Sequence, residues 1–184
     1  MRSTDESRTR CLTGRAVVDA IGTGRSEGAD TVFVQDGRIE RVCRMEPGLR
    51  RSLETSEQID FEDLGDRLIL PAFVNAHALL DLAHLGPRPY GGDFVSWAGG
   101  VARARAEAEQ AGVSPRTVVA EAAQRSLAEG ICAVGDIAGT EDAVRGRLDT
   151  GLTGRSWLEV FGLGARESRG VEAARDRLDD LRPE

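Results

Sequence analysis

The chain has 184 residues, of which 40% are hydrophobic and 30% charged, a globular composition that suits one ordinary domain or a small domain with part of a larger one. The formal net charge is −7 and no long basic run occurs, which argues against nucleic acid or an anionic membrane surface as a partner. All 24 basic residues are arginine, so a Walker-type phosphate loop and Schiff-base chemistry, which both need lysine, are excluded.

The three cysteines, Cys11, Cys43 and Cys132, lie far apart and fit neither a metal-binding pair nor a disulfide framework. This usage is typical of a reducing compartment. The first residues lack the apolar stretch of a secretion signal, and no run approaches the roughly 20 apolar residues of a membrane helix. We therefore expect a cytoplasmic protein that does not enter membranes.

Residues 1–66 are predicted to form a small β domain. Asp36-Gly37 separates two β-rich runs, and this dipeptide is a strong hairpin signal because both turn positions favour positive φ. Before the hairpin, the polar start of the chain is expected to be frayed and to lead into a short strand. The expected segments are a frayed 1–10, a strand within 12–19 and hairpin strands at 31–35 and 38–42.

Residues 67–184 follow a different pattern. The run from Leu68 to Val74 is continuously apolar, as in a strand buried on both faces of a parallel sheet. After it, strands and helices alternate, which predicts parallel βα units. The expected strands are about 68–76, 131–135 and 156–161, and the expected helices are 93–111, 115–129, 140–148 and a last one from about 168.

The segment from Leu68 to Asp81 reads LILPAFVNAHALLD. It resembles the first barrel strand of the amidohydrolase superfamily, closest to the cytosine-deaminase-like and chlorohydrolase-like branch, whose usual form is P-G-[FLV]-V-N-A-H-x-H-[LM]-[ED]. Residues 130–136 resemble the second strand of that family, and residues 157–161 the third. The resemblance implies a truncated (β/α) TIM-type barrel of about three βα units, preceded by part of a small β-sandwich domain.

The same resemblance implies a metal-dependent hydrolase of C–N bonds, deaminase-like, with zinc as the favoured divalent metal and a small heterocyclic or nucleoside-like amine as substrate. In H-x-H on a strand, the period of two aims both imidazoles at one ion. Here His77 keeps the first position as a relic ligand, Leu79 occupies the second, and Ala72 replaces the usual glycine. The sequence ends at Glu184, about where a fourth strand would begin, so the later ligands have no counterpart and we expect no activity from this chain alone.

Three carboxylates, Asp81, Asp136 and Glu159, could face the pocket of this site. Asp81 falls where the family often carries Glu or Asp, and Asp136 ends the second predicted strand, so both are substrate-pocket candidates. Asp136 could equally cap the loop that follows it. For Glu159 a structural role is favoured, and His84 matches no ligand position of the family.

A second interpretation stays open beside the hydrolase. The chain could be a non-catalytic fragment or pseudoenzyme that acts as an interaction module and completes its sheet with a partner. Three strands cannot close a barrel, and open sheet edges pair with other chains. We therefore expect self-association or pairing with a complementing C-terminal half.

Overall fold

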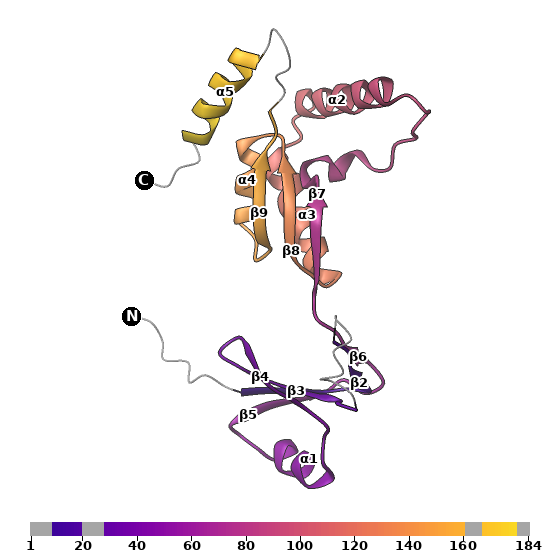
Figure 1. Ribbon diagram of the computed structural model, residues 1–184, viewed down its shortest axis with the longest axis vertical. Coiled ribbons are helices and arrows are strands. Elements are labelled where there is room, and N and C mark those ends of the chain that lie inside the picture. The colour runs from indigo at the N-terminus through magenta and orange to yellow at the C-terminus, as the bar shows by residue number, and fades with distance from the viewer. Residues whose placement is uncertain (1–8, 20–27, 161–166, 180–184) are drawn as a thin grey trace. The chain divides into compact units, whose positions relative to one another are not determined.

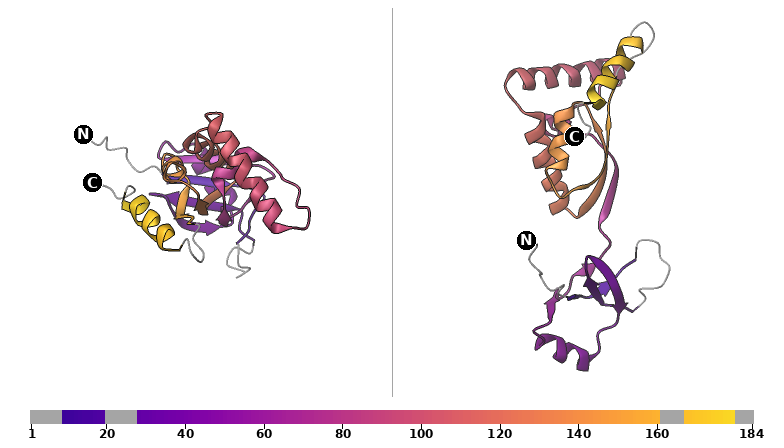
Figure 2. Two further views of the ribbon diagram at one scale, coloured as in Figure 1. Left: turned by 90° about the horizontal axis from the view of Figure 1, so that it is seen from above. Right: turned by 90° about the vertical axis from the view of Figure 1, so that its left-hand side faces the viewer.

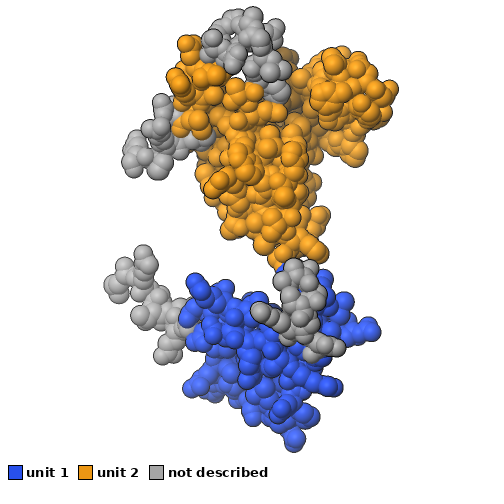
Figure 3. All heavy atoms as spheres, in the orientation of Figure 1, with its two compact units in different colours: residues 1–71 blue, residues 72–184 orange. Residues whose placement is uncertain are grey.

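A computed structural model describes residues 9–19, 28–160 and 167–179 of the chain. The chain divides into two compact units, residues 1–71 and residues 72–184 (Figure 3). Each unit has its own sheet and its own apolar core. None of the helices in the described ranges combines the length and apolarity that a membrane span requires.

Unit 1 contains a four-stranded sheet in the order β4-β3-β1-β5, with helix α1 beside it. β1 pairs antiparallel with β3 and parallel with β5. Its core is formed by Cys11, Phe33 and Leu53, and burial raises the pKa of the Cys11 thiol to about 11, so this thiol stays protonated. The elements are β1 (Thr9–Thr13), β3 (Thr31–Gln35), β4 (Arg38–Cys43), α1 (Pro47–Glu54) and β5 (Ile59–Asp63).

The predicted hairpin is confirmed. β3 and β4 pair antiparallel, and Asp36 and Gly37 between them have φ angles of 50° and 72°. Both positive values are what a two-residue turn between right-twisted strands requires. Helix α1 and strand β5 were not predicted, and neither was the start of β1 at Thr9, inside the segment expected to be frayed.

The prediction that Leu68 and Ile69 begin the first barrel strand is wrong. They form β6 (Leu68–Ile69), which pairs in parallel with β2 (Ala16–Val17) inside unit 1. The N–H of Arg15 donates to the carbonyl of Arg67 at 2.8 Å. The two segments approach closely at Gly14, where a Cβ would lie 2.6 Å from the Arg67 carbonyl oxygen.

Unit 2 contains a parallel three-stranded sheet in the order β7-β8-β9, flanked by helices (Figure 1). The predicted alternation of strands and helices is confirmed. The third strand begins earlier than expected, at Thr153, and Phe161, its expected end, lies outside the described residues. The elements are β7 (Phe73–Ala78), η1 (Leu80–Leu85), α2 (Phe94–Gln110), α3 (Pro115–Ala128), β8 (Ile131–Ala138), α4 (Glu141–Leu148), β9 (Thr153–Leu158) and α5 (Glu167–Asp179).

The predicted helix starts of unit 2 are confirmed by their caps. The Asp93 carboxylate accepts from the N–H groups of Val95 and Ser96 and begins α2. The Ser114 and Thr140 hydroxyls accept from backbone N–H groups at the starts of α3 and α4. Each cap satisfies donors that the first helical turn leaves without an intrahelical partner.

Helices α3 and α4 cover one face of the sheet, and no described element of unit 2 covers the other face, called here the open face (Figure 2). On the covered face, Val119 and Ala123 of α3 pack against Val134 and Ala138 of β8. The expectation that the first strand is buried on both faces is wrong, because Val74 of β7 is 66% exposed. Among the described elements, none packs over that side of the strand, so the apolar run meets solvent.

Candidate functional site

The candidate residues gather at one edge of unit 2, where the three strands end. Parallel strands present their carboxyl ends at the same edge, so β7, β8 and β9 finish together at Ala78, Ala138 and Leu158. Helices α2 and α5 lie beyond this edge (Figure 1). In βα folds this edge carries the ligand-binding and catalytic groups, which makes it the candidate site.

His77 lies at the end of β7 with an exposed side chain. The next residue, Ala78, is buried in the core beneath the helices, and the register of β7 against β8 shifts between Asn75 and Ala78, so His77 lies within an irregularity of the strand. The His77 N–H donates to the Asn75 side-chain oxygen at 3.2 Å. Leu79, at the position of the second histidine, precedes η1 and is 37% exposed.

Asp81 is buried rather than open to the sheet face. Its side chain is only 2% exposed, and one carboxylate oxygen, Oδ2, is paired with the guanidinium of Arg105 on α2. The same oxygen accepts the N–H of Gly139 at 3.0 Å. One carboxylate therefore connects η1, α2 and the loop after β8.

The backbone carbonyl of Gly139 is bound by a residue of helix α5. It accepts a hydrogen bond of 2.7 Å from Nη2 of Arg177 on α5, and Nε of the same guanidinium pairs with Glu141. Glu159 contributes its backbone: its carbonyl accepts from Arg177 at 3.4 Å, and its N–H donates to the Ala138 carbonyl at 2.8 Å. We call Asp81, Arg105, Gly139, Glu141 and Arg177 the strand-end cluster.

Asp136 is fully buried inside β8. Its Oδ1 accepts the N–H of Leu80 at 3.1 Å, and its Oδ2 accepts the hydroxyl of Ser156 at 3.3 Å. The Ser156 oxygen in turn accepts from Nε of Arg147, a buried arginine of α4, at 2.8 Å. The side chain therefore anchors the loop after β7 and the neighbouring strand β9, while its role in a substrate pocket stays a prediction.

The surroundings of Asp136 disfavour the charged form of its carboxyl group. Burial raises the pKa of its carboxyl above the usual value, although the Leu80 N–H opposes the shift, and the carboxylate of Asp81 raises it further. Arg147 and Ser156 favour the ionised form. Burial is the strongest of these effects, so Asp136 takes up a proton at a higher pH than an ordinary aspartate side chain.

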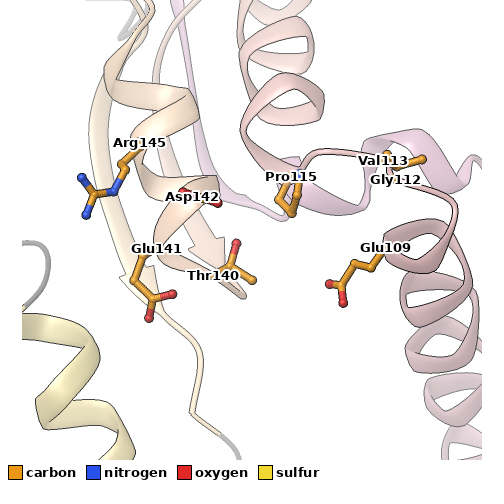
Figure 4. Close-up of a pocket in the computed structure, with 8 residues that line it drawn as sticks. All are labelled: Glu109, Gly112, Val113, Pro115, Thr140, Glu141, Asp142 and Arg145. Atoms are coloured by element: carbon orange, nitrogen blue, oxygen red, sulfur yellow. The ribbon is translucent and has the colours of Figure 1, made fainter.

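A pocket of about 650 Å³ lies on the outside of the helices, between the end of α2 and the start of α4 (Figure 4). Glu109 extends towards the start of α4, where Glu141 and Asp142 lie, whereas Arg145 points away from Glu109 (Figure 4). Because Glu141 is already paired with Arg177, this acidic lining is part of the ion-pair network around the strand-end cluster.

Solved structures show which fold this is. The chain superposes on the zinc complex of atrazine chlorohydrolase from Arthrobacter aurescens TC1 with a TM-score of 0.69 at 19% identity, over 95% of this chain and 43% of that one. It superposes on Helicobacter pylori aminofutalosine deaminase, in complex with methylthio-coformycin, with a TM-score of 0.65 at 19% identity, over 95% and 41%. The chain therefore shares its fold with these solved hydrolase and deaminase structures.

Molinate hydrolase is a further structural neighbour, with a TM-score of 0.55 at 24% identity over 95% of this chain and 38% of that one. The chain thus spans about two fifths of the length of the solved structures that it matches. No protein-family profile and no curated protein matches the sequence. The resemblance first seen around His77 is therefore confirmed at the level of the fold.

The described part of the chain does not fit a metal ion by itself. Within residues 9–19, 28–160 and 167–179, no three His, Cys, Asp or Glu side chains are grouped so that they could hold one. His77 offers one imidazole, Leu79 offers none, and the buried carboxylates of Asp81 and Asp136 are engaged by protein groups. A catalytic zinc site needs about three protein ligands, so no catalytic step through a metal follows from these residues.

The arginines of this edge were not predicted as site residues. Arg105 and Arg147 lie on helices whose sequences read as ordinary polar surface, yet the first is largely buried and the second is 6% exposed. Their partners are side chains or carbonyls brought close by the tertiary fold. A lone arginine on a predicted helix carries no signal that would reveal this pairing.

Proposed function

We propose that this chain forms the first part of an amidohydrolase-type, metal-dependent hydrolase of C–N bonds. The substrate we propose is a small heterocyclic or nucleoside-like amine, which the enzyme would deaminate. The fold supports this assignment, and so does the position of His77, exposed at the end of β7. The cysteine usage supports a cytoplasmic location.

We further propose that these residues are not sufficient for catalysis. The observation that carries the proposal is the pair of positions at the end of β7, where an exposed imidazole at His77 is followed two residues later by the non-ligating Leu79. A single imidazole neither holds zinc nor orients a water molecule. Further ligands, zinc among the candidate metals, would have to come with additional strands that extend this sheet.

The Leu79→His variant tests this account. A second imidazole restores the family's pair of histidines, but two ligands still leave the ion largely open, so we expect no metal-dependent release of ammonia. Ammonia would be measured with zinc or iron present on a panel of aminotriazines, aminopyrimidines and adenosine, against His77→Ala as the control. Activity of Leu79→His above that control would show that the chain completes a working centre with residues of its own.

A second candidate function is that of an interaction module that completes its sheet with a partner. It is favoured by the open sheet face, where Val74 and Trp157 are 66% and 48% exposed, and by the strand order, in which β7 and β9 each pair on one side only within the described part. Co-expression with the C-terminal part of a solved triazine hydrolase would separate the two candidates. Under either candidate function, co-expression should give a higher soluble yield. Only the hydrolase proposal predicts metal-dependent release of ammonia.

A further inference from the structure

The carboxylate of Asp81 is satisfied on one side only. Oδ2 receives the Gly139 N–H and the Arg105 guanidinium. Oδ1 is buried and has no hydrogen-bond partner among the described residues. A buried carboxylate oxygen without a partner is costly, and native structures rarely leave one in that state.

A small cavity lies next to this carboxylate. It measures about 10 Å³ and lies between η1, α2 and α3, with Asp81, His84, Arg105, Glu109 and Val118 among the residues that line it. A volume of this size is about that of one water-sized sphere.

We propose that this cavity binds one water molecule, which donates a hydrogen bond to Oδ1 of Asp81. His84, Arg105 and Glu109 also line this cavity, and their polar side chains are the further partners available to a bound water. A metal cation is disfavoured because Arg105 already places its positive charge on this carboxylate. Any larger ligand is excluded by the volume.

The bound water completes the strand-end cluster. With it, both oxygens of Asp81 have hydrogen-bond partners while the side chain connects η1, α2 and the Gly139 loop. Asp81 thereby acts as a positioning residue for the loops at the strand ends, through a site that is independent of the proposed hydrolase function.

A high-resolution crystal structure of the full chain tests the proposal directly. We expect a density peak inside the cavity, about 2.7–3.0 Å from Oδ1 of Asp81, the usual length of an O–H···O hydrogen bond. A cavity without density would overturn the proposal, and so would a rotated His84 side chain whose nitrogen occupies the position of the water.

The Val118→Ile variant provides a second measurement. Its added methylene enters the cavity, so displacing the water should lower the melting temperature by about 2–4 °C, the shift that corresponds to roughly 1 kcal/mol in a chain of this size. The matched control is Val144→Ile, a half-buried valine of α4 that packs against the same core but does not line the cavity. A higher melting temperature for Val118→Ile than for wild type would mean that the cavity is dry.

Discussion

Replacing Asp136 with alanine is expected to destabilise unit 2 by about 3 kcal/mol, because a buried donor left without its acceptor costs about 1–3 kcal/mol and the cavity adds to that loss. The Leu80 N–H and the Ser156 hydroxyl would both lose their acceptor. The charge of the buried Arg147 would lose the nearby carboxylate that offsets it. Asparagine keeps an oxygen for Leu80 and a polar group for Ser156, so Asp136→Asn is expected to retain the fold.

Tryptophan fluorescence during urea denaturation reports on unit 2 specifically, since both tryptophans of the chain, Trp97 and Trp157, lie in it. The matched control is Asp142→Ala, the same substitution at an exposed position of α4. The anchoring role of Asp136 would be refuted by an Asp136→Ala protein that unfolds at the same urea concentration as wild type and the control.

The raised pKa of Asp136 predicts that the stability of wild type and the stability of Asp136→Asn depend differently on pH. Because burial raises this pKa in the folded state, the folded protein binds a proton before the unfolded chain does as the pH falls. Wild type therefore gains stability relative to Asp136→Asn between the raised pKa and the usual carboxyl pKa. Only the difference between the two proteins is informative, because the lowered pKa values of Asp63, Asp93 and Asp149 cost both proteins stability in acid.

A second prediction concerns the face of the unit 2 sheet that helices α3 and α4 do not cover. We expect the purified chain to form oligomers, because parallel strands are normally covered on both faces and unpaired strand edges pair with other chains. Val74 lies on this face opposite Ala133, and Trp157 lies on it beside Ile137. Val74→Glu places a charge there and should shift the protein towards monomer in size-exclusion chromatography with light scattering.

Leu148→Glu is the control for this shift. Leu148 is 63% exposed, about as much as Val74, but it lies on α4, away from the open face. An unchanged oligomer in the Val74→Glu protein would show that association uses another surface. A sharp wild-type monomer with cooperative thermal unfolding would show that the chain covers this face by itself.

Local signals explain which parts of the fold could be predicted. The hairpin at Asp36-Gly37 and the starts of α2, α3 and α4 depend on residues close together in the chain, and each was found where the pattern placed it. The order of strands and helices in unit 2 follows from the same periodicities. Contacts within one turn of a helix or within a hairpin can therefore be predicted from the local residue pattern.

The features that the sequence did not predict depend on tertiary contacts. The apolar run from Leu68 to Val74 reads as one strand, and only the pairing of β6 with β2 divides it between the two units. For Asp136 the sequence left two roles open, pocket or cap. The structure shows a third role, in which Asp136 accepts the Leu80 N–H and so anchors the loop after β7. The sequence pattern did not predict this role because Leu80 lies 56 residues earlier in the chain.

The metal content of the purified chain tests the central claim most directly. Elemental analysis after gel filtration in the presence of zinc and iron should find well below one metal ion per chain, since His77 stands beside Leu79 and the described residues form no three-ligand group. His77→Ala serves as the reference for adventitious binding and should retain the same amount. Close to one zinc or iron per chain, lost in His77→Ala, would contradict the account and place a complete metal centre within these 184 residues.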